Sequence, residues 1–245
     1  MTFLRSMAFF VGVVLFTPFF GVLVFAARLF GFPACYRMAQ RWGRWVLAWV
    51  WITCGIRHHV EGEEHIPDYP VVVLSKHQSA WETLFLLTRL PPAGWIIKRE
   101  LRWLPVVGWC LIILHAISID RSSGRQARDQ IVEQGKDRLA EGTWVIIFPE
   151  GTRVAPGKRK RYGAGGALLA VMTGTPVLPV ALNAGEVWGR YSFLKYPGTI
   201  EVRFGPLVQT KDKTVEQVNA EVEVWIEGEM AKISPELYAT DDTPF

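Results

Sequence analysis

A histidine and a glutamate that could act together lie in the segment SKHQSAWE at residues 75–82. His77 precedes Glu82 by five positions and follows the apolar run 71–74, which is typical of a buried strand. One ring nitrogen of His77 could face a substrate hydroxyl while the Glu82 carboxylate binds the other nitrogen and fixes the tautomer. An alcohol deprotonated in this way can attack an acyl thioester without a serine or cysteine nucleophile. The pair therefore predicts acyl transfer to an alcohol, and the alternative is a chance pair that only caps a helix.

A second polar block, FPEGTR at residues 148–153, follows another apolar run that ends at a proline and a glycine. Loops at strand ends in α/β domains commonly contact ligands, and Arg153 offers a planar fork suited to phosphate. Glu150 could hold a substrate hydroxyl or bind Arg153. The alternative is a solvated Glu150–Arg153 pair at a turn.

The elements around these blocks alternate between short apolar runs and helical patterns. Strands are predicted at 71–74, 95–98, 116–119, 144–148, 177–181 and 199–204, and helices at 124–140, 165–172 and 215–233. This order predicts an α/β fold, a single layered domain with a largely buried central sheet flanked by helices. We assign the catalytic domain to residues 57–245 and a membrane-associated helical pair to residues 1–56.

The first part of the chain is apolar enough to enter a membrane. Met7 to Ala27 carries no charge, but Pro18 lies near its middle and predicts a kink or break in a helix. A cleaved signal peptide is the alternative, and it is disfavoured by the arginines that follow. These are Arg28, Arg37, Arg41 and Arg44. Their charge should keep the following chain in the cytoplasm.

Residues 34–55 form an amphipathic pattern with Trp42, Trp45 and Trp49 at helical spacing beside a stripe of arginines. Tryptophan favours the headgroup level and arginine favours anionic phosphates. We therefore predict an interfacial helix on a membrane surface, and an ordinary core-packed helix is the alternative.

Charge and cysteine content restrict the function classes. The net charge of +4 suits a phosphate-bearing partner, but no nucleic-acid-binding signature is present, so lipid is preferred to nucleic acid. The three cysteines share no CxxC spacing, which argues against a disulfide framework or a zinc knuckle. The histidines and glutamates at 58–65 lack metal-ligand spacing as well, so no metal is expected, and His115 is predicted to be structural.

Four blocks in order along the chain resemble those of the glycerolipid acyltransferases, most closely the bacterial 1-acylglycerol-3-phosphate acyltransferases. They are residues 77–82, residues 108–121 ending in ISIDR, residues 148–153, and VLPV at 177–180. The resemblance covers roughly residues 60–205, and the histidine block together with FPEGTR is highly specific.

The resemblance implies roles for particular residues. His77 would be the general base and Glu82 would orient it, while Pro179 would shape the acyl or acceptor pocket. The acceptor's glycerol phosphate would be bound by residues of the other blocks and by a basic residue before a Glu-Leu pair. These are Lys98, Arg121, Glu150, Gly151, Thr152 and Arg153.

The reaction implied by the resemblance uses acyl carrier protein or coenzyme A thioesters as co-substrates and no other cofactor. The fatty acyl group would pass to the sn-2 hydroxyl of lysophosphatidic acid, giving phosphatidic acid for phospholipid biosynthesis. The setting implied is a bacterial inner membrane, with the catalytic domain facing the cytoplasm and in contact with membrane phospholipids.

One residue departs from the family pattern, which has aspartate where this chain has Glu82. Glutamate keeps the charge and both acceptor oxygens, so it can still orient an imidazole. The change leaves the acceptor in question, and another lysolipid such as a lyso-ornithine lipid is an alternative. A non-catalytic membrane lipid-binding protein is the alternative from a different class.

Overall fold

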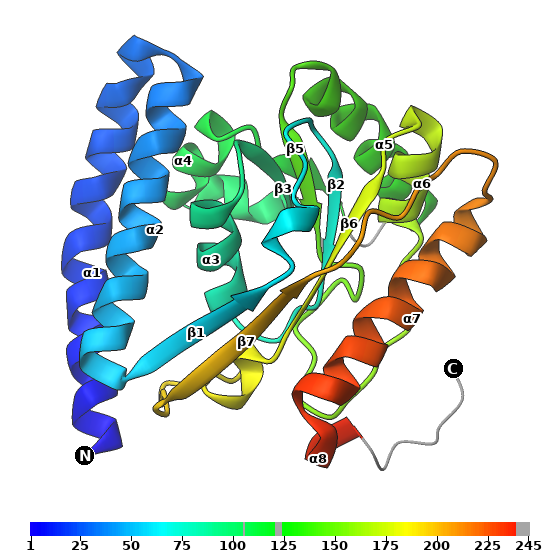
Figure 1. The fold of residues 1–245 in the computed structure, drawn as a ribbon. Coiled ribbons are helices and arrows are strands. Elements are labelled where there is room, and N and C mark those ends of the chain that lie inside the picture. Colours follow the sequence, from blue (N-terminus) through cyan, green and yellow to red (C-terminus); the bar gives the residue numbers. More distant parts are fainter. Residues whose placement is uncertain (105, 121–123, 239–245) are drawn as a thin grey trace.

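A single seven-stranded sheet forms the centre of the protein, as a computed structural model covering residues 1–104, 106–120 and 124–238 shows (Figure 1). The strands are β1 Ile56–Glu61, β2 Val72–Ser75, β3 Ala93–Lys98, β4 Ile117–Ile119, β5 Trp144–Ile147, β6 Val177–Leu182 and β7 Gly198–Phe204. Their order in the sheet is β1-β7-β6-β2-β5-β3-β4. From β6 to β4 neighbouring strands are parallel, whereas β7 runs antiparallel to β6 and parallel to β1. The predicted α/β fold with one buried central sheet is confirmed, and the six predicted runs form β2 to β7.

Helices cover both faces of this sheet (Figure 1). They are α1 Thr2–Ala27, α2 Phe32–Cys54, α3 Trp81–Arg89, α4 Val107–Ile113, α5 Arg125–Ala140, α6 Gly165–Thr173, α7 Val215–Ile233 and α8 Pro235–Tyr238. Short 3-10 turns lie at η1 Arg28–Phe30, η2 Glu63–His65, η3 Arg99–Trp103 and η5 Ala184–Glu186. The three predicted helices correspond to α5, α6 and α7.

Alternate residues of the central strands serve two separate apolar cores. Val73 packs in one core with residues of α2 and α3, whereas Leu74 packs in the other with residues of α5, α6 and α7. A parallel strand that is buried on both faces has this continuous apolar sequence, which explains why the run at 71–74 was recognisable. The first core extends into the N-terminal helices, because Val46 and Val50 of α2 belong to it.

The helix α1 runs unbroken through Pro18, so the predicted break does not occur. The proline removes one backbone hydrogen bond, but the aromatic side chains on either side of it pack on the same residue of α2. The ring centroid of Phe16 lies 4.9 Å from that of Trp45, and the centroid of Phe20 lies 6.2 Å from it. These contacts hold the two halves of α1 against α2.

Three tryptophans of α2, Trp42, Trp45 and Trp49, contact α1. Trp42 Nε1 donates a hydrogen bond to Thr17 Oγ1 over 3.2 Å, and Trp49 Nε1 donates to the Ala8 carbonyl over 3.3 Å. The opposite side of α2 packs on α3, where Gly43 allows Thr88 to approach closely. Trp42, Trp45 and Trp49 are half-buried and help to bind the two N-terminal helices together, whereas Trp51 is 53% exposed. The interfacial position of α2 on a membrane stays a prediction.

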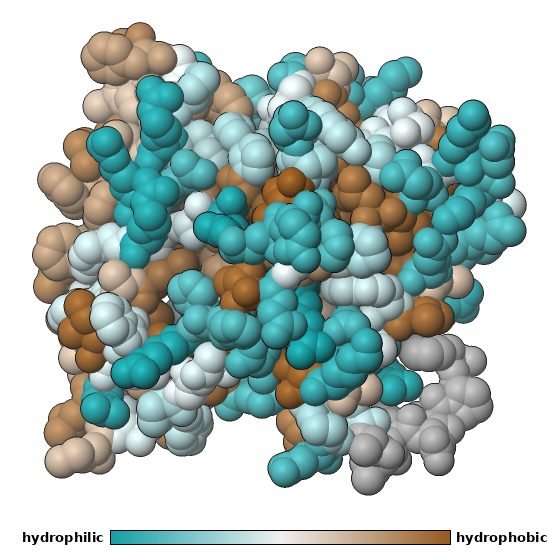
Figure 2. Space-filling view, viewed as in Figure 1, coloured by the Kyte–Doolittle hydropathy of each residue, from teal (hydrophilic) through white to brown (hydrophobic). Residues whose placement is uncertain are grey.

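An extended apolar surface lies on α1, on the flank of the molecule seen at the left of Figure 2. By length and composition, the stretch Thr2–Phe30 is able to cross a membrane. Only 17% of its most apolar window is buried, whereas the core helix of a soluble protein would be mostly buried. This exposure is compatible with membrane association.

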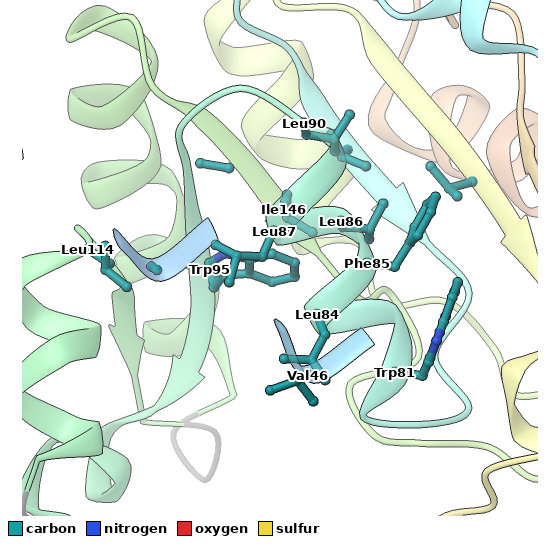
Figure 3. Close-up of a cluster of buried hydrophobic side chains, with 14 of the residues drawn as sticks. Val46, Trp81, Leu84, Phe85, Leu86, Leu87, Leu90, Trp95, Leu114 and Ile146 are labelled. Atoms are coloured by element: carbon teal, nitrogen blue, oxygen red, sulfur yellow. The ribbon is translucent and has the colours of Figure 1, made fainter. Parts of the chain in front are cut away.

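Helix α3 is held firmly between α2 and the sheet. Its apolar residues are buried, and in Figure 3 Leu84 lies beside Val46 of α2 and Leu87 beside Trp95 of β3. Phe85 stacks on Trp81 with the ring centroids 4.9 Å apart. Burial of each large apolar side chain contributes roughly 1.5–3 kcal/mol relative to exposure. The N-terminal turn of α3, which carries Glu82, therefore has a fixed place beside the end of β2.

Candidate active site

Four parallel strands bring the predicted polar residues to one edge of the sheet. His77 follows the end of β2, Phe148 follows β5, Lys98 ends β3 and Asp120 follows β4. The carboxyl ends of parallel strands meet at the same edge, where α/β proteins commonly bind ligands. Arg121, a predicted phosphate ligand, lies outside the described residues.

His77 and Glu82 form the predicted pair. His77 Nδ1 lies 2.8 Å from Glu82 Oε1, and the Glu82 side chain is fully buried while 14% of the His77 side chain is exposed. A carboxylate accepts the proton on Nδ1, so Nε2 is left as the nitrogen that can accept a proton from a substrate. The extra methylene of glutamate relative to aspartate is accommodated without loss of this hydrogen bond.

Glu82 also holds the loop that carries His77. The same Oε1 accepts hydrogen bonds from the backbone N–H groups of Gln78, over 2.8 Å, and Ser79, over 2.6 Å. A carboxylate in the first turn of a helix is favoured there by the helix dipole and the free N–H groups. Gln78 and Ser79 precede Ala80, the N-cap residue of α3, so Glu82 holds the loop before the helix and the imidazole of His77 with the same oxygen.

The imidazole of His77 is stacked on Phe148. The ring centroids are 3.7 Å apart and the planes differ by 8°, and Phe148 in turn lies 6.0 Å from Trp95. Stacking and the Glu82 hydrogen bond together fix both the plane and the rotation of the imidazole. This role of Phe148 was not predicted from the sequence, although an aromatic residue directly at a strand end was a usable signal.

Glu150 lies beneath residues 76–80, the loop between β2 and α3 that carries His77 and is called here the histidine loop. It is not in solvent. The residue is 2% exposed, its Oε2 accepts the N–H of His77 over 2.8 Å, and its Oε1 lies 2.8 Å from Lys76 Nζ. Burial raises the pKa of Glu150 to about 7, against the opposing effect of the Lys76 cation. The expected pair between Glu150 and Arg153 is wrong, because Lys76 is the cation that Glu150 binds. The other expected role, contact with a substrate hydroxyl, is not supported, since both carboxylate oxygens are already engaged.

The rest of the FPEGTR loop is tied to the histidine loop. Gly151 has a φ of +67°, a left-handed conformation that favours glycine, and its N–H donates to the Phe148 carbonyl over 3.0 Å. The N–H of Val154 donates to the His77 carbonyl over 2.8 Å. Thr152 and Arg153 are half-buried between these points. The turn therefore clamps the backbone of His77 from both sides.

Arg153 and Lys98, two of the predicted phosphate ligands, have different neighbours. The carbonyl of Arg153 accepts from the guanidinium of Arg190 over 3.0 Å, and its own guanidinium lies 6.0 Å from the ring centroid of Tyr191. Lys98 is 55% exposed and lies 3.4 Å from Glu100. Both side chains remain near the surface at the carboxyl edge, where they could meet a charged ligand.

Two other predicted residues take structural places. Pro179 is buried within β6, and its carbonyl accepts the N–H of Gly205 over 2.9 Å, so it belongs to the sheet. His115 is stacked on Phe32 at 4.0 Å between ring centroids, in agreement with a structural role. In the part of the chain that the structure describes, no group of three or more His, Cys, Asp or Glu side chains is arranged to hold a metal ion.

The chain is similar in sequence to known proteins. The family model described as Acyltransferase matches residues 57–183. A 1-acyl-sn-glycerol-3-phosphate acyltransferase of Pseudomonas aeruginosa is 43% identical over 86% of this chain and 84% of that protein. The chain belongs to the acyltransferase family. The alpha form of 1-acyl-sn-glycerol-3-phosphate acyltransferase from Mus musculus is 32% identical over 68% of this chain and 60% of that protein.

The fold of this acyltransferase also has a close structural counterpart. The crystal structure of the 1-acyl-sn-glycerophosphate acyltransferase from Thermotoga maritima superposes with a TM-score of 0.80, covering 95% of this chain and 96% of that one at 24% identity. This likeness extends over the N-terminal helices as well as the sheet. The arrangement of α1 and α2 against the acyltransferase domain is therefore a shared property of the fold.

Proposed function

We propose that this acyltransferase transfers a fatty acyl group from acyl carrier protein or coenzyme A to the sn-2 hydroxyl of 1-acylglycerol-3-phosphate, giving phosphatidic acid. The observation that carries the proposal is the His77–Glu82 pair, held at 2.8 Å on the ligand-binding edge of the sheet. The name of the Pseudomonas aeruginosa relative supports the choice of acceptor.

The reaction proceeds in one direct transfer. Nε2 of His77 takes the proton of the acceptor hydroxyl as the oxygen attacks the thioester carbonyl, and the Glu82 carboxylate stabilises the imidazolium that forms. The tetrahedral intermediate then collapses, the carbon–sulfur bond breaks, and the thiolate takes the proton from the imidazolium. The step needs no metal, because the proton and the leaving group are balanced between the two substrates and His77.

The acceptor's phosphate is assigned to the basic residues at the same edge. Arg153 and Lys98 come from the ends of neighbouring strands, and Arg121 follows β4 in the sequence. Guanidinium groups bind phosphate oxygens in pairs, which gives orientation as well as affinity. Such contacts would place the glycerol sn-2 hydroxyl near His77.

The acceptor assignment is tested by an acylation assay on the purified protein in detergent. Labelled acyl carrier protein and coenzyme A thioesters are each offered with lysophosphatidic acid and with a phosphate-free lyso-ornithine lipid. Formation of phosphatidic acid with either donor is expected. Acylation of the lyso-ornithine lipid alone would contradict the phosphate site but not the reaction type, and no acylation at all would favour the lipid-binding alternative.

Replacement of Arg153 by alanine should weaken acceptor binding without slowing chemistry. A charge-assisted hydrogen bond contributes about 1.5–3 kcal/mol, so KM for lysophosphatidic acid should rise about 10- to 100-fold while kcat changes little. The matched control is Arg128→Ala, because Arg128 is an exposed arginine on α5. An unchanged KM in Arg153→Ala would remove this residue from the phosphate site.

The membrane contact is proposed to include more than α1. Large apolar side chains are exposed on η3 and α4, and this surface is named the η3–α4 surface. It consists of Leu101, Trp103, Leu104, Val107, Trp109 and Ile112. It adjoins α1, because Cys110 Sγ lies 3.9 Å from the Gly21 carbonyl. Trp103 is 82% exposed, and tryptophan is favoured at the headgroup level of a bilayer. The enzyme would lie with this surface in the cytoplasmic leaflet of a bacterial inner membrane.

An environment-sensitive fluorophore on Trp103→Cys tests the membrane contact. In vesicles containing anionic phospholipid, its emission should shift to the blue and be quenched by lipids that carry a quencher on the acyl chain. The control is Val224→Cys on α7, which is 72% exposed and lies across the molecule from α1 (Figure 1). Equal quenching at both positions, or none at position 103, would contradict the proposed orientation.

A further inference from the structure

A group of charged and polar side chains is buried directly beneath the histidine loop, on the side of the sheet covered by α7. Lys76 is fully buried, Glu227 is 5% exposed, and Tyr162 and Tyr238 are 3% and 2% exposed. With Glu150 they form what is called here the buried charge cluster. Isolated charges are costly to bury, so a cluster of this kind calls for a physical explanation.

Lys76 is the centre of the cluster. Its Nζ lies 2.8 Å from Glu150 Oε1 and 2.6 Å from Glu227 Oε1, and it is 5.9 Å from the ring centroid of Tyr238. The hydroxyl of Tyr162 donates to the same oxygen of Glu227 over 2.9 Å. Burial lowers the pKa of Lys76, but the attraction of Glu150 and Glu227 is stronger and the net shift is upward. The lysine is therefore held in its charged form.

The charges are nearly balanced. Arg159 Nε lies 3.9 Å from Glu227 Oε2, so two cations face two carboxylates when all four groups are ionised. Removing only one partner of a buried ion pair leaves an uncompensated charge and is strongly destabilising. Balanced removal of a cation and a carboxylate together should be tolerated better.

The cluster connects α7 to the backbone of the catalytic residue. Glu227 lies on α7, Lys76 bridges it to Glu150, and Glu150 accepts the backbone N–H of His77. The neighbouring Gln78 is held on the same side, because its amide donates to the Tyr238 hydroxyl over 3.0 Å and its side-chain oxygen accepts the N–H of Gly185 over 3.0 Å. None of these contacts involves the imidazole itself.

We propose that Lys76 and Glu227 are positioning residues for catalysis. They fix the Glu150 carboxylate, which in turn holds the backbone of His77 in the position from which the imidazole contacts Phe148 and Glu82. The inference rests on the proposed function only in that His77 is the reacting base. Glu150 is in this account a positioning residue and not a ligand of the acceptor. Because the Glu150 carboxylate already binds His77 and Lys76, the phosphate of the acceptor is bound by the cations near the surface.

Kinetics of Lys76→Met, Glu227→Gln and the double variant distinguish positioning from acceptor binding. Misplacement of a catalytic group by about 1 Å can cost about 10²-fold in rate, so kcat of Lys76→Met should fall about 10- to 100-fold, with KM for lysophosphatidic acid nearly unchanged. The double variant removes a cation and a carboxylate together, so its kcat should lie between those of the parent and Lys76→Met. If Lys76→Met does not fold, the double variant alone tests the positioning role. Its kcat should be lower than that of the parent, and an equal kcat would contradict the proposal.

The matched control is Lys195→Met. Lys195 is also a buried lysine, at 7% exposure, but it donates to the carbonyls of Ser192 and Phe193, away from the histidine loop. Its loss should lower the melting temperature and leave kcat of the folded enzyme near that of the parent. A purely structural role for Lys76 would give the same behaviour as Lys195→Met.

A readout independent of turnover separates this inference from the proposed function. In protein labelled with ¹⁵N-histidine, the Nδ1 resonance of His77, assigned by its absence in His77→Ala, should move in Lys76→Met and stay in place in Lys195→Met. An inactive parent would contradict the acceptor proposal, and the resonance would still test the positioning. Unchanged kcat and an unmoved resonance in Lys76→Met would overturn the inference, as would a raised KM with unchanged kcat.

Discussion

Replacing His77 by glutamine should lower kcat about 10³-fold while the protein stays folded and bound to membranes. A positioned general base contributes roughly 10²–10⁴-fold to a rate, and His77 is the group with a carboxylate-fixed tautomer at the ligand edge. The glutamine side chain is similar in length to that of histidine and can still occupy the space beside Phe148. The measurement is kcat for acyl transfer to lysophosphatidic acid, together with the melting temperature in detergent.

The control for this variant is His59→Gln. His59 is 58% exposed on β1 and its Nδ1 lies 2.9 Å from Glu201, so it also forms a histidine–glutamate pair but lies on another part of the sheet. Its kcat should equal that of the parent. A His77→Gln enzyme with kcat within tenfold of the parent would show that another group removes the proton.

Replacing Glu82 by glutamine should have the second largest effect, a fall in kcat of about 10²- to 10⁴-fold. The amide can still accept hydrogen bonds from the loop, but it cannot balance the positive charge that forms on the imidazole. Its NH2 group can also donate to Nδ1 and so favour the wrong tautomer. Because the substitution conserves volume, the melting temperature should change less than the rate.

The variant Glu82→Asp distinguishes the effect of the carboxylate charge from the effect of side-chain length. The carboxylate remains, but one oxygen now accepts hydrogen bonds of 2.6–2.8 Å from His77, Gln78 and Ser79, and a shorter side chain cannot keep all three without a shift of the loop. We expect an intermediate kcat, above that of Glu82→Gln. If Glu82→Gln were as active as the parent, Glu82 would only hold the loop before α3 and would have no part in catalysis.

Local patterns in the sequence predicted the fold well. The runs at 71–74 and 144–148 are apolar and rich in β-branched residues because those strands are buried on both faces. The His77–Glu82 pair was also predictable from a local pattern, because His77 lies in a loop and Glu82 lies in the helical turn that follows it. Interactions between residues that are close in sequence can be predicted from the residue types and their spacing.

Contacts between distant segments were not predictable in the same way. Glu150 meets Lys76 and His77 only because β5 lies beside β2, and Glu227 reaches Lys76 from α7. One signal was present for Glu227, which adjoins a regular series of buried apolar residues on α7. The continuity of α1 at Pro18 likewise depended on packing against α2, which no local pattern contains.

The central claim is that His77 activates the acceptor hydroxyl for direct attack on the thioester. Its most direct test is a rapid-quench experiment in which the enzyme is mixed with labelled acyl thioester, with and without lysophosphatidic acid. The account predicts that thiol release and labelled phosphatidic acid appear together, and that neither a burst of free thiol nor label on the protein forms without the acceptor. A stoichiometric burst of thiol with acylated protein in the absence of lysophosphatidic acid would contradict it.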